Sequence, residues 1–207
     1  MKKVFIARKD LILCQCLEKK MDYHKPELMQ AYLETHITKK RFMHSMRVAK
    51  LSRDLAKHYG VDAEKAYFAG LTHDLAKELD NGKCLEIIEK ANIFQDTCIK
   101  LMPNLAHGEI AAYILKTEFE IEDEEILNAV RWHTYGHENM SDLDKIVYMA
   151  DVIEPMRNFE NLEKLREITW QNLNMAIHYF FDLCTVYLSK ENQPIHTNTY
   201  KMLKSLH

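Results

Sequence analysis

The most restrictive feature of this chain is an adjacent histidine and aspartate, His73 and Asp74, inside an apolar run. The run reads AGLTHDLAKE at residues 69–78, and its pattern is typical of a buried helix. A buried carboxylate is unfavourable unless a nearby group compensates its charge. A metal ion would do so, and would also bind the neighbouring imidazole. Taken alone, however, the pair is better explained by a salt-bridged aspartate and a packed histidine.

Composition favours a helical protein that works in a reducing compartment. Only 5 Gly and 4 Pro occur in 207 residues, which favours long helices over many short strands, and 47% hydrophobic residues allow a sizeable core. With a formal charge of -3, the chain lacks the overall positive charge that is typical of nucleic-acid-binding proteins. The 5 cysteines are an odd number without a disulfide pattern. We therefore expect a cytoplasmic protein without a nucleic-acid partner.

The first 24 residues form an extension of uncertain structure, and residues 25–207 form the main domain. Two apolar runs, VFIA at 4–7 and LILC at 11–14, could be short strands or one irregular helix. Charged residues at 8–10 interrupt them, which argues against a signal peptide. No apolar stretch reaches membrane-spanning length. Cys14 and Cys16 have no partner pair for a metal site, so we interpret them as structural.

Helix signals punctuate the main domain. Pro26 opens a helix to Glu34. Thr38 caps a helix that ends at Gly60, and Asp62 caps the helix that carries the His73-Asp74 pair. Further helices are predicted at 79–91, 93–101, 105–115 capped by Asn104, 124–133 capped by Asp123, 142–154 capped by Ser141, and 166–188, followed by a polar tail. The helix at 166–188 is apolar enough to leave room for a homodimer interface.

Several polar residues fall in line with the apolar stripes of these helices. His44 precedes Val48, Leu51 and Leu55 at spacings of four, three and four residues. The same reasoning places Asp151 on the inner face of its helix. Stripes from neighbouring helices converge on one core, so their polar members should meet there: His44, His73, Asp74, His107, His133 and Asp151.

Four imidazoles and two carboxylates could hold two divalent cations, with Asp74 as the bridging ligand because it is adjacent to a second ligand. The mixed nitrogen and oxygen donors suit iron, manganese, zinc or cobalt. Lys77 lies four residues after His73, on the same face of the predicted helix. With Arg47 and Arg157 it could neutralise phosphates, and two close metals would activate water and polarise a phosphoryl oxygen. The pattern predicts hydrolysis of a phosphate ester or anhydride.

The order of these residues resembles the HD-domain metal phosphohydrolases. Five blocks, at residues 41–49, 69–78, 107–108, 126–134 and 145–157, are similar to the YqeK-type family of bacterial symmetrical bis(5'-nucleosyl)-tetraphosphatases. The resemblance covers about residues 38–190. It implies an all-α HD-domain helical bundle with a two-metal site in its core, and iron as the first choice of metal. The implied reaction is central cleavage of diadenosine tetraphosphate, a dinucleoside polyphosphate, to two ADP.

The resemblance also implies roles for individual residues. One metal would be held by His44, His73, Asp74 and Asp151, and the other by Asp74, His107 and His133. Lys77, with Arg47 and Arg157, would contact phosphate or nucleotide. Thr134, Tyr135, Gly136 and His137 would line the mouth, although Tyr135 and His137 depart from the family pattern. Two alternatives remain: an HD hydrolase of another nucleotide, or a non-catalytic metal- or nucleotide-binding module.

Overall fold

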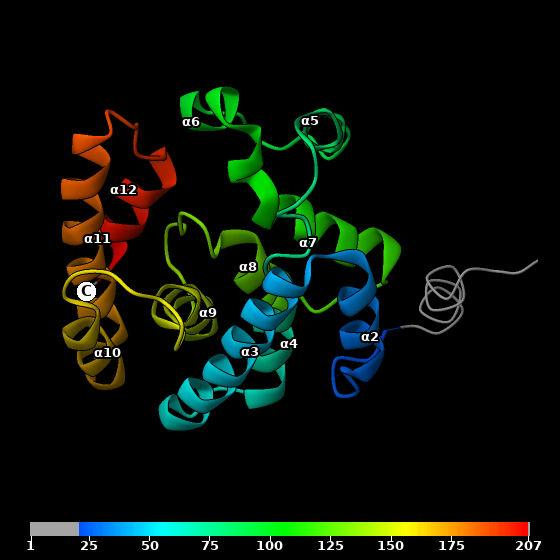
Figure 1. Cartoon of the computed structure of the whole chain (residues 1–207), viewed down its shortest axis with the longest axis horizontal. Coiled ribbons are helices and arrows are strands. Elements are labelled where there is room, and N and C mark those ends of the chain that lie inside the picture. The colour runs from blue at the N-terminus through cyan, green and yellow to red at the C-terminus, as the bar shows by residue number, and fades with distance from the viewer. Residues whose placement is uncertain (1–20, 207) are drawn as a thin grey trace, which may run out of the picture.

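The computed structural model describes residues 21–206, and within this range every regular element is a helix. Figure 1 shows their arrangement. The elements are α2 (Glu27–His36), α3 (Lys39–Tyr59), α4 (Ala63–Thr72), α5 (Asn81–Lys90), α6 (Thr97–Leu101), the 3₁₀ turn η1 (Pro103–Ala106), α7 (His107–Glu118), α8 (Glu124–Trp132), α9 (Asp142–Ile153), α10 (Leu162–Gln171), α11 (Leu173–Lys190) and α12 (Thr197–Ser205). The expected all-α class is confirmed. Cys14, Cys16 and most of the predicted extension lie outside the described residues.

The helix boundaries near the site follow the predicted caps. Thr38, Asp62 and Asp123 accept hydrogen bonds from backbone N–H groups in the first turns of α3, α4 and α8. Ser141 and Asp144 form a capping box at the start of α9. Gly60 ends α3 in the left-handed conformation, with φ of 70°.

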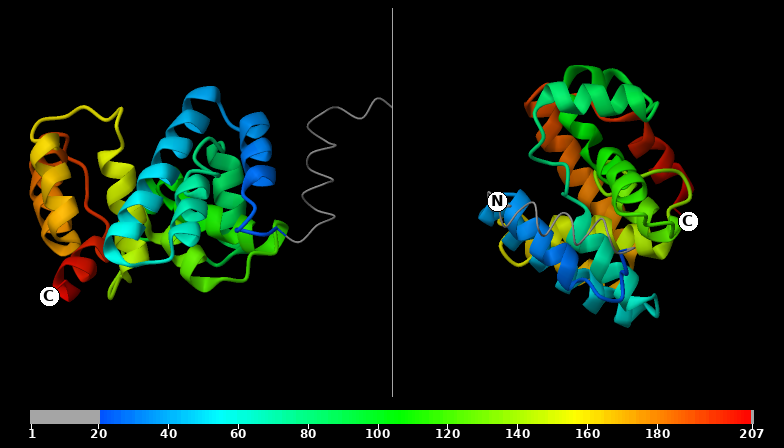
Figure 2. Two further views of the ribbon diagram at one scale, coloured as in Figure 1. Left: turned by 90° about the horizontal axis from the view of Figure 1, so that it is seen from below. Right: turned by 90° about the vertical axis from the view of Figure 1, so that its right-hand side faces the viewer.

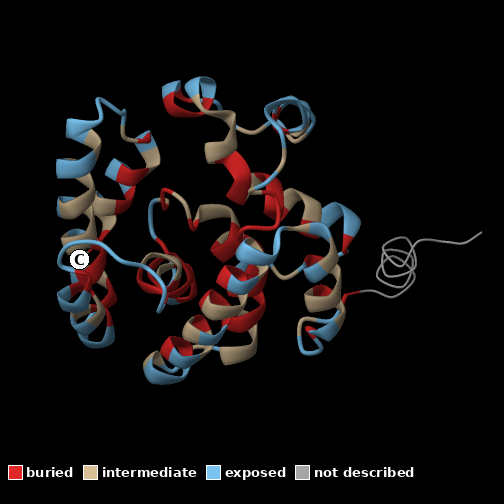
Figure 3. Ribbon diagram, in the orientation of Figure 1, coloured by how far each residue is buried: buried red, intermediate tan, exposed pale blue. Residues whose placement is uncertain are grey.

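The core lies where α3, α4, α8 and α9 pack together. Figure 3 shows buried residues on the facing sides of these helices. The small residues of α4 allow the predicted close approach to α3, because a Cβ added at Gly70 would lie 3.0 Å from Ala49 Cα and 2.7 Å from Ser52 Oγ. This contact brings the helix that carries His44 next to the end of α4.

The His73-Asp74 pair follows α4 and does not lie within it. The predicted helix continued to Lys77, but α4 ends at Thr72 and residues 73–78 form turns. Leu75 N and Lys77 N donate to the carbonyls of Thr72 and Asp74, three residues back, at 3.0 Å. The expectation that Lys77 shares a helix face with His73 was therefore wrong. In this turn, the backbone bonds to residues three positions back replace the α-helical hydrogen bonds.

Side-chain hydrogen bonds of Glu78 and Asn104 hold the turn at residues 73–78 in place. The carboxylate of Glu78 accepts hydrogen bonds from Thr38 N at 2.8 Å and Thr38 Oγ1 at 2.6 Å. The side-chain amide of Asn104 donates to Lys77 O at 2.9 Å. The turn is thus tied to the start of α3 on one side and to η1 on the other.

Three predicted elements were wrong in extent. The single helix at 166–188 is two helices, because Asn172 is extended, with φ of -160°, and caps α11 through Met175 N. The helix at 93–101 shortens to α6, which Asp96 caps. Asn104 does not cap a helix, because residues 103–106 form a 3₁₀ turn and α7 begins at His107. The C-terminal tail contains α12.

The C-terminal helices α10, α11 and α12 lie at one end of the molecule (Figures 1 and 2). Helices α10 and α11 pack on each other and on α9, and α12 is tied to the loop after α8 by hydrogen bonds of Thr199 and Ser205. None of the described helices combines the length and apolar character needed to cross a membrane.

We predict that Gly70→Ala destabilises the protein by about 1–3 kcal/mol, because the new methyl group meets backbone atoms of α3. Gly82→Ala is the matched control, since its methyl group would meet only the Asp80 carboxylate, at 3.2 Å, on an exposed helix. Urea unfolding of both variants measures the difference. Equal free energies of unfolding for the two variants would show that the α3–α4 contact is not tightly packed.

Candidate metal centre

Four buried histidines reach one point of the core from four different elements. His44 lies in α3, His73 follows α4, His107 begins α7, and His133 follows α8. All are at most 7% exposed. Asp74 is next to His73 and buried, and Asp151 on α9 is partly buried. The structure therefore brings together all six predicted metal ligands.

Three of the imidazole rings are held in the same way. Nδ1 lies 2.7 Å from Gly70 O in His73, 2.8 Å from Asn104 O in His107, and 2.7 Å from Val130 O in His133. Each carbonyl belongs to the residue three positions earlier. Because a carbonyl can only accept, each Nδ1 carries a proton and each Nε2 faces the Asp74 carboxylate.

His44 is positioned by a carboxylate instead of a carbonyl. Its Nδ1 lies 3.4 Å from Glu154 Oε1, and Glu154 also accepts from Arg47 Nε at 2.6 Å. Hydrogen bonding to a carboxylate orients a ligating imidazole and raises its basicity. Arg47, predicted to contact substrate, is thus paired with Glu154, which sequence reasoning had not assigned to the site.

Asp74 lies between two pairs of histidines, as a bridging carboxylate should. Its Oδ1 is 3.2 Å from His107 Nε2 and 3.8 Å from His133 Nε2. Its Oδ2 is 3.4 Å from His73 Nε2 and 3.6 Å from His44 Nε2. One carboxylate oxygen therefore faces each pair.

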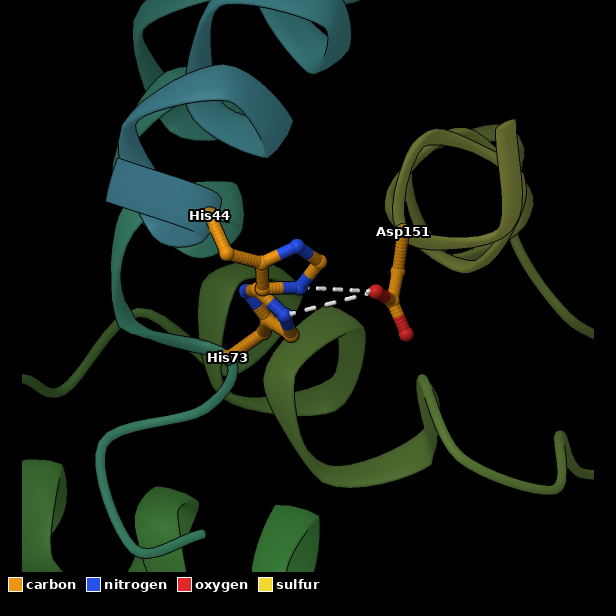
Figure 4. Close-up of side chains that lie close together, drawn as sticks. All are labelled: His44, His73 and Asp151. Atoms are coloured by element: carbon orange, nitrogen blue, oxygen red, sulfur yellow. Dashed lines mark ion pairs between the residues drawn. The ribbon is translucent and has the colours of Figure 1, made fainter. Parts of the chain in front are cut away.

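Asp151 completes the half of the centre that contains His44. Its Oδ1 lies 2.9 Å from His44 Nε2 and 3.8 Å from His73 Nε2 (Figure 4). Two sets of ligand atoms lie within 4.8 Å of one another: His44, His73 and Asp151 in the first set, and His73, Asp74 and His133 in the second.

The arrangement of the imidazole nitrogens suits binding to divalent cations better than hydrogen bonding among these side chains. Among the described residues, His44 Nε2 and His73 Nε2 are buried and have no hydrogen-bond partner, although Asp151 Oδ1 lies 2.9 Å from His44 Nε2. His107 Nε2 and His133 Nε2 are 2.9 Å apart, and their Nδ1 atoms both donate to carbonyls, so two lone pairs face each other. Burial lowers the pKa of His107 to about 4, which keeps its ring neutral. Neutral imidazoles beside carboxylates suit divalent transition metals.

A basic cavity opens beside His44. Its volume is about 670 Å³, and it is lined by Thr38, Lys40, Arg41, Met43, His44, Arg47, Glu78, Glu154, Met156 and Arg157. Arg41 forms an ion pair with Asp74, and Arg157 Nη2 lies 2.7 Å from Asp151 Oδ1. Both arginines therefore contact carboxylates of the metal centre.

Arg41 is the functional candidate that sequence reasoning missed. Its position three residues before His44 on α3 places the two side chains on the same helix face, and this spacing was the available signal. Lys77 also reaches the centre, with Nζ 3.3 Å from His107 Nδ1. Burial lowers the pKa of Lys77, and the charges of Asp74 and Asp151 partly oppose this effect.

The loop after His133 is only partly at the centre. Thr134 Oγ1 lies 3.2 Å from His107 Nε2. Tyr135 instead donates to Glu109, Gly136 packs beside Met202, and His137 Nε2 lies 3.2 Å from Asp144 Oδ2. The structure thus brings Thr134 to the candidate centre and gives the next three residues contacts with other elements, so that the predicted role of this loop at the mouth stays a prediction.

A sequence model of the HD domain matches residues 41–156, which contain all six candidate ligands. This chain belongs to the HD-domain family. It is 38% identical over 167 residues to the symmetrical bis(5'-nucleosyl)-tetraphosphatase of Halalkalibacterium halodurans, covering 81% of this chain and 89% of the relative. The enzyme of the same name from Bacillus subtilis is 32% identical, over 82% of this chain and 91% of the relative. These relatives confirm the predicted membership of the symmetrical tetraphosphatase family.

A solved HD-family structure has the same fold. It is described as a predicted HD superfamily hydrolase involved in NAD metabolism from Clostridium acetobutylicum. The TM-score is 0.84 at 34% identity, covering 91% of this chain and 98% of that one. The HD fold therefore extends well beyond the matched domain core.

We predict that the protein binds two divalent ions per chain after anaerobic loading with ferrous iron. Asp151→Ala should retain about one of them, because Asp151 approaches only the half of the centre that contains His44. Asp74→Ala should lose both, because one Asp74 oxygen faces each pair of histidines. His178→Ala is the control, since His178 is exposed on α11. Elemental analysis after desalting measures the ratio, and equal metal content in all variants would refute the ligand assignment.

The metal-free protein should lose stability as the pH falls. Burial lowers the pKa of His107 from 6.5 to about 4, so between these pH values the unfolded chain binds more protons than the folded one. From about pH 7 to about pH 4.5, the free energy of unfolding should fall by roughly 2–3 kcal/mol more in wild type than in His107→Gln, at about 1.36 kcal/mol per pKa unit. Urea unfolding in chelator tests this, and parallel pH curves would contradict it.

Proposed function

We propose that this chain is a metal-dependent hydrolase that cleaves diadenosine tetraphosphate symmetrically into two ADP. The observation that carries the proposal is the Asp74 carboxylate, with one oxygen facing each of two histidine pairs. This arrangement belongs to a chain that is 38% identical to a symmetrical tetraphosphatase over most of its length. Fold and donor geometry therefore support the same chemistry.

The proposed cofactor is a pair of divalent ions, with iron as the first choice and manganese, cobalt or zinc as alternatives. Such a pair, when bound, lowers the pKa of a water molecule and polarises a phosphoryl oxygen. His44, His73 and Asp151 would hold one ion, and His107 and His133 the other. Asp74 would contribute one oxygen to each.

The side chains around the centre would bind and orient the polyphosphate. Arg41 and Arg157 each contact a carboxylate of the centre, so a phosphate bound there would come within reach of both guanidinium groups. Arg47 donates two hydrogen bonds to the Glu154 carboxylate, at 2.6 and 3.3 Å, and these fix its position in the wall of the basic cavity.

Lys77 and Thr134 contact the opposite half of the centre, next to His107. The Lys77 ammonium would steady a phosphate oxygen as charge develops in the transition state. Thr134 would donate its hydroxyl hydrogen to the substrate. Tyr135, Gly136 and His137 would line the mouth beside Thr134, held in place by their contacts with Glu109, Met202 and Asp144.

Three further expectations belong to the same proposal. The protein would act in the cytoplasm, it would have no nucleic-acid partner, and α11 could contribute to a homodimer. Met175, Val186 and Tyr187 on α11 are each about 60% exposed, as an interface residue would be in a single chain.

We predict that the iron-loaded enzyme converts diadenosine tetraphosphate to ADP alone. Asp74→Asn should lower kcat by at least about 10³-fold, because it removes the shared negative ligand while keeping the shape of the side chain. Chromatography of the products measures both, and circular dichroism checks that the variant is folded. Production of AMP and ATP would refute central cleavage, and no turnover with any of the four metals would refute the proposed substrate.

A further inference from the structure

A carboxylate outside the predicted ligand set lies beside the metal centre. Glu154 follows the last residue of α9, three positions after Asp151, and is 3% exposed. The groups of described residues that could hold a metal ion do not include it. Because burial of a carboxylate is unfavourable unless its oxygens are bonded, its partners indicate what it does.

Four donors surround the two oxygens of Glu154. Oε1 lies 3.4 Å from His44 Nδ1 and 3.3 Å from Arg47 Nη2. Oε2 accepts from Arg47 Nε at 2.6 Å and from Met156 N at 2.8 Å. A carboxylate has about four lone-pair sites, so these donors occupy its capacity. Glu154 has no site left for a metal ion, and its role is to position its partners.

His44 needs an acceptor on another element. It lies in the interior of α3, where the backbone carbonyls are bonded within the helix. The other three histidines of the centre use carbonyls near helix ends. For His44 the carboxylate of Glu154 on α9 takes this part, and it turns Nε2 of the ring toward Asp74 and Asp151.

Glu154 also holds the turn that carries Arg157. Arg157 N donates to Glu154 O at 2.9 Å, and Met156 N in the same turn donates to the side chain. From α10, Arg166 Nη2 donates to Glu154 O at 2.9 Å and Arg166 Nε donates to Ile153 O at 3.1 Å. The end of α9 is therefore rigid, and Arg157 starts from a fixed backbone.

We propose that Glu154 is a positioning residue that couples metal binding at His44 to phosphate binding in the basic cavity. The inference rests on the proposed function. A backbone carbonyl could orient His44, but a carboxylate can also hold the guanidinium of Arg47 by two bonds. Any displacement of Glu154 therefore disturbs a metal ligand and a phosphate-binding cation together.

The sharpest test is a variant of Arg47, because this side chain lies outside the ligand set. Within the described chain its ion pair is with Glu154, and it pairs with no candidate metal ligand. Arg47→Lys keeps the positive charge but cannot form the two-pronged bond. Glu154→Gln keeps the shape of the side chain but replaces one acceptor oxygen by a donor. Glu86→Gln, at an exposed position on α5, is the matched control.

Manganese alone is titrated into the metal-free protein, and free manganese is measured by electron paramagnetic resonance. We expect Glu154→Gln to weaken the binding of one of the two ions by about 10- to 100-fold and to leave the other unchanged. Arg47→Lys should weaken the same ion by about three- to tenfold, although it removes no ligand. At saturating manganese, calorimetry should show about tenfold weaker binding of inorganic pyrophosphate by both variants. The control should match wild type throughout.

Three results would overturn the inference. Wild-type manganese affinity in Arg47→Lys would show that the two partners of Glu154 are not coupled, and this variant decides alone if Glu154→Gln does not fold. Equal weakening of both ions in Glu154→Gln would indicate a general structural role. Wild-type affinity of folded Glu154→Gln for either manganese or pyrophosphate would show that Glu154 does not position both groups.

A failure of the proposed function is seen separately from these results. In that case wild type releases no ADP from diadenosine tetraphosphate, whatever the variants bind.

Discussion

The structure depends on one buried carboxylate. Asp74 is 3% exposed and faces the Nε2 atoms of four histidines at 3.2 to 3.8 Å. An isolated charge at this depth would be very unfavourable. Arg41 is the cationic side chain paired with it. The centre of the core therefore favours further positive charge. The histidines that face Asp74 lie in or next to α3, α4, α7 and α8, so this carboxylate connects the four helices.

The ends of the helices supply the scaffold for this carboxylate. The last four carbonyls of a helix lack intrahelical partners. Gly70 O in α4 and Val130 O in α8 are such carbonyls, and they receive the Nδ1–H groups of His73 and His133. His73 and His133 therefore lie just beyond the helices that position them. A histidine in the middle of either helix would find its carbonyl neighbours already bonded.

The sequence was sufficient to predict which residues meet, because a polar residue in an apolar stripe must face the core. This reasoning identified His44 and Asp151, and capping residues such as Thr38 and Asp62 predicted where α3 and α4 begin. It failed where tertiary contacts decide the backbone. The apolar pattern across Asn172 looks continuous, yet that residue turns the chain. Apolar periodicity likewise continued through residues 73–78, where bonds from Thr38 to Glu78 hold a turn.

Hydrophobic periodicity also could not predict the charge pairs that connect distant parts of the chain at the site. The separation of 107 residues between Arg47 and Glu154 gives no signal in a single sequence, and neither does the pairing of Arg41 with Asp74. These pairs explain why the site suits a polyanion. Asp74 and Asp151 contribute two negative charges, so two divalent ions would leave a formal surplus of roughly +2 before any arginine is counted. Arg41 and Arg157, already drawn to the carboxylates, would then be repelled by the metals and attracted to the ligand. A chain of phosphates satisfies both the metals and the arginines, whereas a neutral substrate would satisfy neither.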